Sequence, residues 1–387
     1  MKLAILSDLH CHHSSCEPQD TFLLTDALRH PINQHPVEAL LKMICEKCLT
    51  ADYLVMLGDL TNRVDIQGLI SGWKFIEEIA LALKVKDIIV TVGNHDVDIR
   101  NMHKMGNPNH VAQNFNHSFP FLDEGAKKKF WSDGYVVLHP ENAVCFVIIN
   151  STHSNITDTQ VKRGSVSDVI LEAIDSEIVS IQSDLKIMVC HHHPLLHSDV
   201  GWSEDHVMLN GERLVALAEK HKFSIILHGH KHYPRITKSS GISGLPVPVF
   251  AAGSFSAMIK GNLATVTRNQ FHLVEFSSNT PVQGLIRSWE YGIASGWEKT
   301  VYRSSGFPSR TGFGFQGSIP ALSTAIADFY KTAGQALLSW SIVEAQYPET
   351  RYLSPVELRV LAQHLAMTSL EIDPEPPNTP KSIGKIV

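Results

Sequence analysis

The stretch Asp87 to Asp96, DIIVTVGNHD, decides the fold. Residues 88 to 92 are all β-branched, which predicts a short strand buried on both faces. Gly93 ends that strand, and Asn94, His95 and Asp96 follow at once. An amide oxygen, an imidazole and a carboxylate would therefore lie at the carboxyl end of a strand, where open α/β sheets bind their ligands. The ordinary alternative is a turn, which Gly, Asn and Asp also favour.

Four further apolar segments end in the same kind of side chain. They are 2–7, followed by Asp8 and His10; 52–57, followed by Gly58 and Asp59; 186–190, followed by His191; and 223–227, followed by His230 and His232. Helical segments are predicted between them, at about 37–49, 69–84, 168–182 and 211–221. This alternation predicts an α/β fold whose strands are buried between helical layers, and the number of strands favours two packed sheets.

Composition limits the class of protein. The chain has 387 residues, of which 43% are hydrophobic, and a net charge of −6, which argues against a broad cationic surface for nucleic acid or lipid. The opening MKLAILSD is typical of a strand rather than of a signal peptide, and no run of eighteen apolar residues occurs. Cys45 and Cys48 form a CxxC without a second one, which favours buried helical thiols over a zinc site. The expected location is cytoplasmic, with no membrane partner.

The seven strand-end residues other than His95 and Asp96 form a mixed ligand set. Three carboxylate or amide oxygens and four imidazoles suit two divalent ions, Mn²⁺, Fe²⁺/Fe³⁺ or Zn²⁺, better than calcium or a thiolate zinc finger. Two such ions, about 3.5–4 Å apart, can hold the oxygens of a phosphate ester and convert a bridging water to hydroxide. The residues therefore predict hydrolysis of a phosphate ester by in-line attack.

Five motifs in this order resemble those of the calcineurin-like metallophosphoesterases, over about residues 1 to 280. They are Asp-x-His at 8–10, Gly-Asp at 58–59, Gly-Asn-His-Asp at 93–96, a histidine after a strand at 191, and Gly-His-x-His at 229–232. The resemblance implies a four-layer α-β-β-α sandwich, with two packed mixed sheets flanked by helices. Two departures are the triple histidine at 191–193 and the extra His228.

The resemblance also implies a role for each motif residue. The implied metal ligands are Asp8, His10 and His232 for the first ion, Asn94, His191 and His230 for the second, and Asp59 as the bridge. His95 would lie near the leaving group, where an imidazolium can protonate the departing oxygen. Asp96 would orient the ring of His95.

The last hundred residues differ in character. Residues 302–318 are rich in Gly, Ser and aromatic residues and predict an ordered loop or linker. An apolar stripe predicts a helix from about 321 to 344, and Ser354, Pro355 and Glu357 open a second helix with a capping box. Residues 373–380 predict a disordered tail. We expect a metallophosphoesterase domain at 1–290 and a two-helix extension at 291–387, which would cover the core or bind a protein partner.

Three alternatives remain open. DLHCHH also resembles the opening of the polymerase-and-histidinol-phosphatase type of phosphoesterase, in which His10 and His12 would bind metal, but GNHD and GHKH then lack roles. The chain could also be an inactive, partner-binding member of the calcineurin-like fold. Within the enzyme class, a phosphodiester substrate is favoured, and a nuclease acting on DNA or RNA is the main alternative, because Arg63, Lys231, Arg235 and Lys238 could guide a strand.

Overall fold

A computed structural model describes most of the chain. The described residues are 1–98, 103–116, 118–141, 143–153, 158–196, 206–277, 282–299 and 307–385. They fall into two compact units, of which the larger comprises Lys2–Phe271 and Glu290–Glu298, and the smaller comprises Met1, His272–Trp289 and Lys299–Val387. The expected domain boundary between residues 290 and 291 stays a prediction.

Two large sheets are present, as predicted. The first contains β1 (Lys2–Leu6), β2 (Tyr53–Met56), β3 (Asp87–Val90), β10 (Gln270–Phe276), β11 (Gly284–Gly292), β12 (Gly296–Lys299) and β13 (Arg310–Phe313), in the order β12-β11-β10-β1-β2-β3 with β13 paired to β11. The second contains β4 (Tyr135–Glu141), β5 (Val144–Ile149), β6 (Leu185–Val189), β7 (Ile225–His228), β8 (Arg235–Lys238) and β9 (Pro248–Ala251), in the order β4-β5-β6-β7-β9-β8. The strands that precede the motifs run parallel, β1 with β2 and β3, and β6 with β7.

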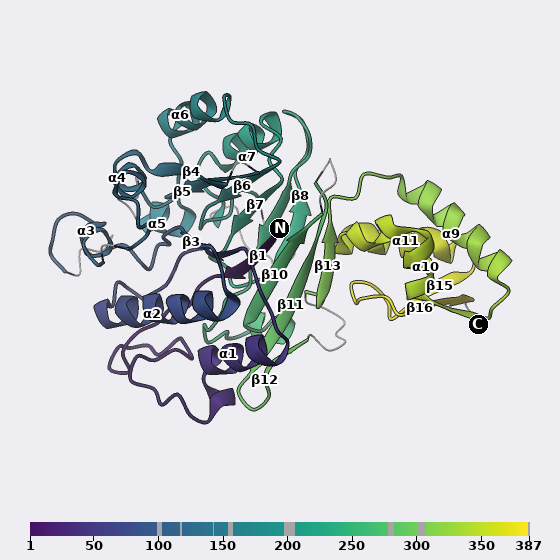
Figure 1. The fold of residues 1–387 in the computed structure, drawn as a ribbon, viewed down its shortest axis with the longest axis horizontal. Coiled ribbons are helices and arrows are strands. Elements are labelled where there is room, and N and C mark those ends of the chain that lie inside the picture. The colour runs from purple at the N-terminus through teal and green to yellow at the C-terminus, as the bar shows by residue number, and fades with distance from the viewer. Residues whose placement is uncertain are drawn as a thin grey trace. The chain divides into compact units, whose positions relative to one another are not determined.

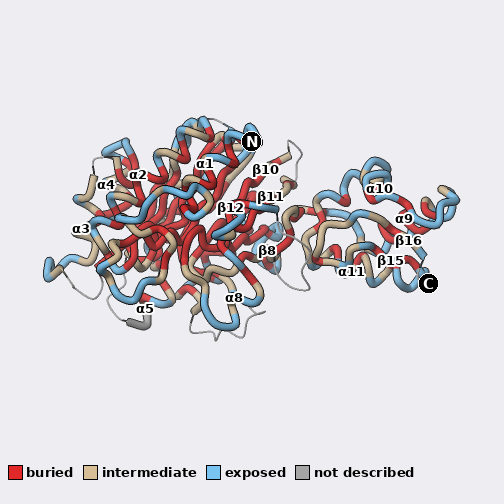
Figure 2. The backbone as a smooth tube through the Cα atoms, turned by 90° about the horizontal axis from the view of Figure 1, so that it is seen from below, coloured by how far each residue is buried: buried red, intermediate tan, exposed pale blue. Residues whose placement is uncertain are grey.

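The two sheets pack face to face in the larger unit. The rings of Tyr53 on β2 and Phe146 on β5 lie 5.3 Å apart. The hydroxyl of Thr91, directly after β3, donates to the main-chain oxygen of Ile149 at 2.8 Å. Strands such as β2 and β5 are buried along their whole length, and Figure 2 shows this buried interior in red. Because both faces of these strands are covered, they are apolar at every position rather than at alternate ones.

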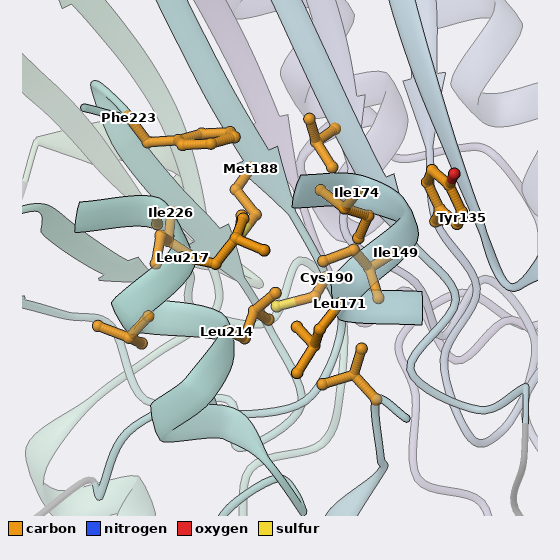
Figure 3. Packing of buried hydrophobic residues seen from close by; sticks show 14 of the residues in the cluster. Tyr135, Ile149, Leu171, Ile174, Met188, Cys190, Leu214, Leu217, Phe223 and Ile226 are labelled. Atoms are coloured by element: carbon orange, nitrogen blue, oxygen red, sulfur yellow. The ribbon is translucent and has the colours of Figure 1, made fainter. Parts of the chain in front are cut away.

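Helices cover the two outer faces. In Figure 1, α1 (Pro36–Glu46) and α2 (Ile66–Leu83) lie on one side of the sheets, and α6 (Asp168–Ile178) and α7 (Gly211–Lys220) on the other. Figure 3 shows how Ile174 of α6 and Leu214 of α7 pack on Met188 of β6. The shorter helices of this unit are α3 (His110–Gln113), α4 (Glu124–Asp133), α5 (Asp158–Arg163) and α8 (Leu263–Val266). The observed layers confirm the predicted four-layer α-β-β-α sandwich.

The C-terminal residues differ from the prediction of two helices and a disordered tail. They form α9 (Ile319–Ala333), α10 (Trp340–Gln346) and α11 (Pro355–Ala366), with a three-stranded sheet of β14 (Leu337–Ser339), β15 (Leu370–Asp373) and β16 (Ser382–Lys385). The predicted helix over 321–344 is broken because Gly334, in the left-handed conformation, ends α9. Residues 373–380 connect β15 to β16, whose Ile372 and Ile383 are buried. The predicted capping box of α11 is confirmed.

Two further expectations differ from the structure. Within the predicted linker 302–318, residues 302–306 lie outside the described residues, and 310–313 form β13, which pairs with β11. Cys45 and Cys48 are exposed rather than buried, because α1 turns Val37, Leu40 and Ile44 to the core instead. In the described part of the chain, no helix combines the length and apolarity that a membrane crossing requires.

The packing in Figure 3 leads to a stability prediction. Ile174→Ala should lower the free energy of unfolding by about 2–5 kcal/mol, because it leaves a cavity at a fully buried position between α6 and β6. Urea denaturation of the two proteins measures the difference. Val169→Ala on the same helix is the control, since Val169 is 75% exposed and should change stability by less than about 0.5 kcal/mol. Equal effects of the two substitutions would contradict this packing.

Candidate metal centre

The predicted ligands come together in the larger unit. The predicted ligands follow β1, β2, β3, β6 and β7, and all of them except Asn94 belong, with His95 and His192, to four groups whose ligand atoms lie within 4.8 Å of one another. The groups are Asp8, His10 and His232; Asp8, Asp59 and His191; His10, Asp59 and His95; and His191, His192 and His230. Because Asp8, His10, Asp59 and His191 each belong to two groups, the clusters form one continuous site.

Asp8, His10 and His232 form the first cluster. The Nε2 atoms of His10 and His232 are 3.0 Å apart, and Asp8 Oδ1 lies 3.7 Å from the first and 3.4 Å from the second. The other carboxylate oxygen, Oδ2, accepts from the Ser7 hydroxyl and from the His230 amide. These two bonds fix the Asp8 carboxylate so that Oδ1 faces the imidazoles.

Asp59 lies between the two halves of the site. Its Oδ2 is 3.2 Å from Nε2 of His191 and 3.8 Å from Nε2 of His10, while Oδ1 accepts from the His95 amide at 2.8 Å. Nδ1 of His191 is 2.7 Å from the Leu57 main-chain oxygen. Because a carbonyl only accepts, Nδ1 carries the proton, and in the neutral ring Nε2 presents its lone pair to the site.

The histidines of the triplet 191–193 have different partners. His191 faces Asp59, whereas His192 has Nδ1 2.8 Å from the Ser151 hydroxyl and Nε2 3.1 Å from the Val161 oxygen. Both ring nitrogens of His192 thus have hydrogen-bonding partners of their own. His230 has its Nε2 2.8 Å from the Lys162 oxygen, which leaves Nδ1 as the atom available on the other edge of the ring. This geometry supports the choice of His191 from the triplet.

Several buried polar atoms test whether the site fits metal ions. Within the described residues, Asp8 Oδ1, Asn94 Oδ1 and His191 Nε2 are buried and make no hydrogen bond of good geometry. A buried polar atom without a partner is costly, so such atoms in a native site need an explanation. A carboxylate, an amide oxygen and an imidazole nitrogen are all donors to divalent transition metals. The residues therefore fit the metals that the sequence predicts.

The backbone of the site is strained. Asp8, His10, Asp59, His230 and His232 all have left-handed φ values, between 50° and 82°. Such a conformation is uncommon for residues other than glycine, and clusters of them mark sites where the surrounding structure holds the chain against its preference. Here these residues lie two to four residues after the ends of β1, β2 and β7. The left-handed turn redirects the chain so that its side chains converge on one point.

Close packing explains the glycines of the motifs. A Cβ on Gly93 would overlap Oδ1 of Asp59, and a Cβ on Gly229 would overlap the Ser7 hydroxyl and approach Oδ2 of Asp8 at 2.8 Å. Any other residue at these positions would therefore displace a carboxylate. The glycines that the motifs contain are required by the approach of the backbone to the Asp8 and Asp59 side chains.

Burial and charge set the protonation of the centre. Burial opposes the charged form of His191, but the Asp59 carboxylate outweighs it and raises the pKa of His191 to about 9. Burial alone would raise the pKa of Asp59, whereas His191 and His95 hold that pKa below its usual range. Burial lowers the pKa of His95 to about 4. The carboxylate is therefore ionised, as a cation site requires, and His95 is neutral near pH 7.

His95 has a partner that the sequence reasoning missed. Its Nδ1 lies 2.6 Å from Oδ1 of Asn62, and Nδ2 of Asn62 donates to Oδ1 of Asp20 at 2.7 Å. The second bond fixes which amide atom faces the imidazole, so Nδ1 of His95 is the protonated nitrogen. The only sequence signal for Asn62 is its place three residues after Asp59.

The expectation that Asp96 orients the His95 ring is corrected. Its carboxylate accepts from the amides of Asp59 at 2.7 Å, Thr61 at 3.0 Å and Gly93 at 2.9 Å. Burial, reinforced by the charge of Asp59, raises the pKa of Asp96 to about 7, while the amides of Gly93 and Thr61 act in the opposite sense. Asp96 thus joins the loops after β2 and β3, and Asn62 is the residue that holds the His95 ring.

Two other residues named from the sequence lie in different environments. Nε2 of His12 is 3.4 Å from Oδ1 of Asp20, and His12 belongs to none of the ligand groups. The guanidinium of Arg63 donates to the Glu17 main-chain oxygen at 3.2 Å. Among the described residues, His12 therefore lies beside Asp20 and does not join His10 in a ligand group, which argues against the polymerase-and-histidinol-phosphatase alternative.

Comparisons with known proteins bear on the fold and the family. No curated protein matches this chain. A solved purple acid phosphatase from yellow lupin (Lupinus luteus) seeds has a TM-score of 0.51 at 16% identity, over 78% of this chain and 52% of that one. A dimetal phosphatase from Danio rerio has a TM-score of 0.47 at 12% identity, over 76% of this chain and 96% of that one. At such identities the lupin enzyme supports the fold alone.

The family model described as calcineurin-like phosphoesterase matches residues 1–234. That range is more than half of the chain and includes all five motifs. It ends before the C-terminal elements from β8 onward. With this match, the chain belongs to the calcineurin-like phosphoesterases.

Proposed function

We propose that this protein hydrolyses phosphate esters, with phosphodiesters favoured, at a centre of two divalent metal ions. The observation that carries the proposal is the convergence of Asp8, Asp59 and His191, whose ligand atoms lie within 4.8 Å of one another and of which Asp8 Oδ1 and His191 Nε2 are buried without hydrogen bonds of good geometry. Family membership supports the reaction class. Manganese, iron or zinc are the proposed metals, because the ligand set mixes oxygen and imidazole donors.

The residue clusters support a ligand assignment. Asp8, His10 and His232, whose ligand atoms lie together, would hold the first ion. Asn94, His191 and His230 would hold the second, and Asp59 would contribute to both. His192 is left out because both of its ring nitrogens have other partners. When bound, the two ions supply Lewis-acid polarisation of the phosphate and a more acidic bound water.

His95 is proposed to act on the leaving group. Asn62 holds its Nδ1, so that Nε2 is the atom free to exchange a proton with the departing oxygen. The ring is neutral near pH 7 because burial lowers its pKa to about 4. We propose that the imidazolium form of His95 in the substrate complex protonates the departing oxygen through Nε2.

The surroundings of the centre favour a diester. A monoester carries two negative charges near neutral pH and gains most from a bidentate arginine, whereas a diester carries one charge. Arg63, four residues after Asp59, has its guanidinium donating to the Glu17 main-chain oxygen. Among the described residues, the direct partners of the ligands are carboxylates, histidines, a serine and main-chain groups. The cytoplasmic location stays a prediction.

A substrate panel tests the proposal. The protein is reconstituted with manganese, iron or zinc, and its metal content is measured by elemental analysis. Turnover is then compared, at one salt concentration, on p-nitrophenyl phosphate, its bis ester, cyclic nucleotides, and single- and double-stranded DNA. The expected result is two metal ions per chain and faster turnover of the bis ester than of the monoester. Faster cleavage of DNA would favour a nuclease, and no turnover with any metal would favour a partner-binding protein.

Removing a ligand should remove metal and activity together. Asp59→Ala and Asn94→Ala should both lower the metal content and abolish hydrolysis of the bis ester, because each takes away a donor that the second ion needs. Elemental analysis after reconstitution measures the first effect and the esterase assay the second. His13→Ala is the control, since that side chain is 43% exposed and lies outside the ligand groups. Full activity in Asp59→Ala would refute the bridging role.

His95→Ala should separate acid catalysis from metal binding. We expect unchanged metal content and a rate lower by about 10²–10⁴-fold on esters with poor leaving groups, which need the proton most. On p-nitrophenyl esters, whose leaving group is a stable anion, the loss should be smaller. Comparing methyl and p-nitrophenyl diesters measures the difference. Loss of metal in His95→Ala would show that the imidazole is a ligand instead.

Asp96→Asn should act through the fold rather than through the chemistry. An amide nitrogen would replace one oxygen that accepts main-chain N–H groups, so the metal-free protein should lose about 1–3 kcal/mol of unfolding free energy. Urea denaturation in a chelator measures this loss. Asp328→Asn is the control, because its side chain is 65% exposed. Unchanged stability with lost activity would instead make Asp96 a catalytic residue.

A further inference from the structure

The C-terminal module, residues 318–385, has a topology of its own. Its elements follow the order helix, strand, helix, helix, strand, strand, and its sheet has the order β14-β16-β15. These are the element order and the strand order of winged-helix modules, with α10 and α11 as the helix pair and β15–β16 as the wing. The module is coloured green to yellow in Figure 1. Its buried residues, from Leu322 on α9 to Ile383 on β16, form a separate hydrophobic cluster.

A groove of about 470 Å³ runs between α11 and β15. Ala362 and Ala366 line its helical side, and the buried Leu370 and Ile372 contribute to its strand side. Small side chains on α11 leave room beside the strand. The groove lies entirely within the module and outside the residues that the family model matches.

β15 is an edge strand. It pairs with β16 along one side and ends the three-stranded sheet. An exposed strand edge can pair with a strand from another chain, whose alternate side chains then enter the neighbouring pocket. Because the groove adjoins this edge, an added strand would find both main-chain partners and a place for its apolar side chains.

The charged residues around the groove favour a basic protein segment over nucleic acid as its ligand. Glu371 and Glu375 line it and are exposed, and Arg359 is the arginine among the lining residues. The module as a whole has five Lys and Arg residues against seven Asp and Glu, and Arg351 and Lys331 are paired with Glu344 and Asp328. Nucleic acid needs several cations to neutralise its phosphates. An excess of carboxylates is instead complementary to a basic segment of a protein.

We propose that the groove between α11 and β15 binds an extended segment of a protein partner. The segment adds a strand to β15, places apolar side chains against Ala362 and Ala366, and directs Lys or Arg side chains to Glu371 and Glu375. This surface is separate from the metal centre and serves partner binding rather than hydrolysis. It gives the chain a second function that does not depend on the proposed ester chemistry.

Peptide binding to the full chain tests the proposal. The probes are a fluorescent peptide of about eight residues that alternates Lys and Val, its Glu and Val counterpart, and a DNA duplex of about 20 base pairs. Fluorescence anisotropy at one salt concentration measures the three affinities. The Lys peptide should bind at least about tenfold more tightly than the Glu peptide. No binding of the Lys peptide, or equal binding of both peptides, would overturn the proposal.

Two variants locate the binding surface. Ala366→Trp fills the groove at an exposed position and should weaken binding of the Lys peptide at least about tenfold. Glu371→Lys should weaken it as well, because it reverses the charge of the lining. Ala321→Trp, at an exposed position on α9, is the matched control and should bind normally. Tighter binding of the duplex than of the Lys peptide, lost in Ala366→Trp, would make the groove a nucleic-acid site instead.

Circular dichroism and the esterase assay complete the test. All three variants should keep the wild-type far-ultraviolet spectrum, since each substitution is at an exposed position. They should also keep the activity of the parent protein on the bis ester. Normal folding with unchanged peptide binding in both Ala366→Trp and Glu371→Lys would refute the assignment of the groove.

Discussion

The centre depends on one buried carboxylate, that of Asp96. Asp96 accepts hydrogen bonds from the amides of Asp59, Thr61 and Gly93, and so joins the loop after β2 to the loop after β3. Asp59 and Asn94 are presented by these two loops. Charge-assisted bonds of this kind are shorter and stronger than neutral ones. The relative positions of Asp59 and Asn94 therefore depend on the hydrogen bonds that Asp96 accepts.

The metal-free site carries two separate free-energy costs, one in the backbone and one in buried polar atoms. The left-handed residues, among them Asp8 and Asp59, are costly for the backbone, and burial of Asp8 Oδ1 and His191 Nε2 without hydrogen bonds of good geometry is costly for solvation. Neither cost is explained by packing of the metal-free chain. Both are explained if binding of cations offsets them. The occurrence of both costs at one place therefore indicates that this place binds cations.

The order of the sequence motifs predicted which residues gather at the centre, but not the residues that hold their side chains in place. Asp8, Asp59 and His191 could be found because each follows an apolar strand in an ordered set of motifs. Asn62 could not, because its only signal is one polar residue in a loop. In the C-terminal module, an apolar stripe predicted one helix through Leu337, yet that residue is 62% exposed in β14. Periodicity describes a face of a helix but does not show where a glycine ends it.

The main-chain oxygens that hold the imidazoles have an evolutionary consequence. Nδ1 of His191 is fixed by the carbonyl of Leu57, and Nε2 of His230 lies beside the carbonyl of Lys162. No substitution at position 57 or 162 can delete a carbonyl. Substitutions of the surrounding side chains therefore leave the tautomers of these two rings unchanged. Only a change that moves the backbone at residues 57 or 162 would alter the ring orientations.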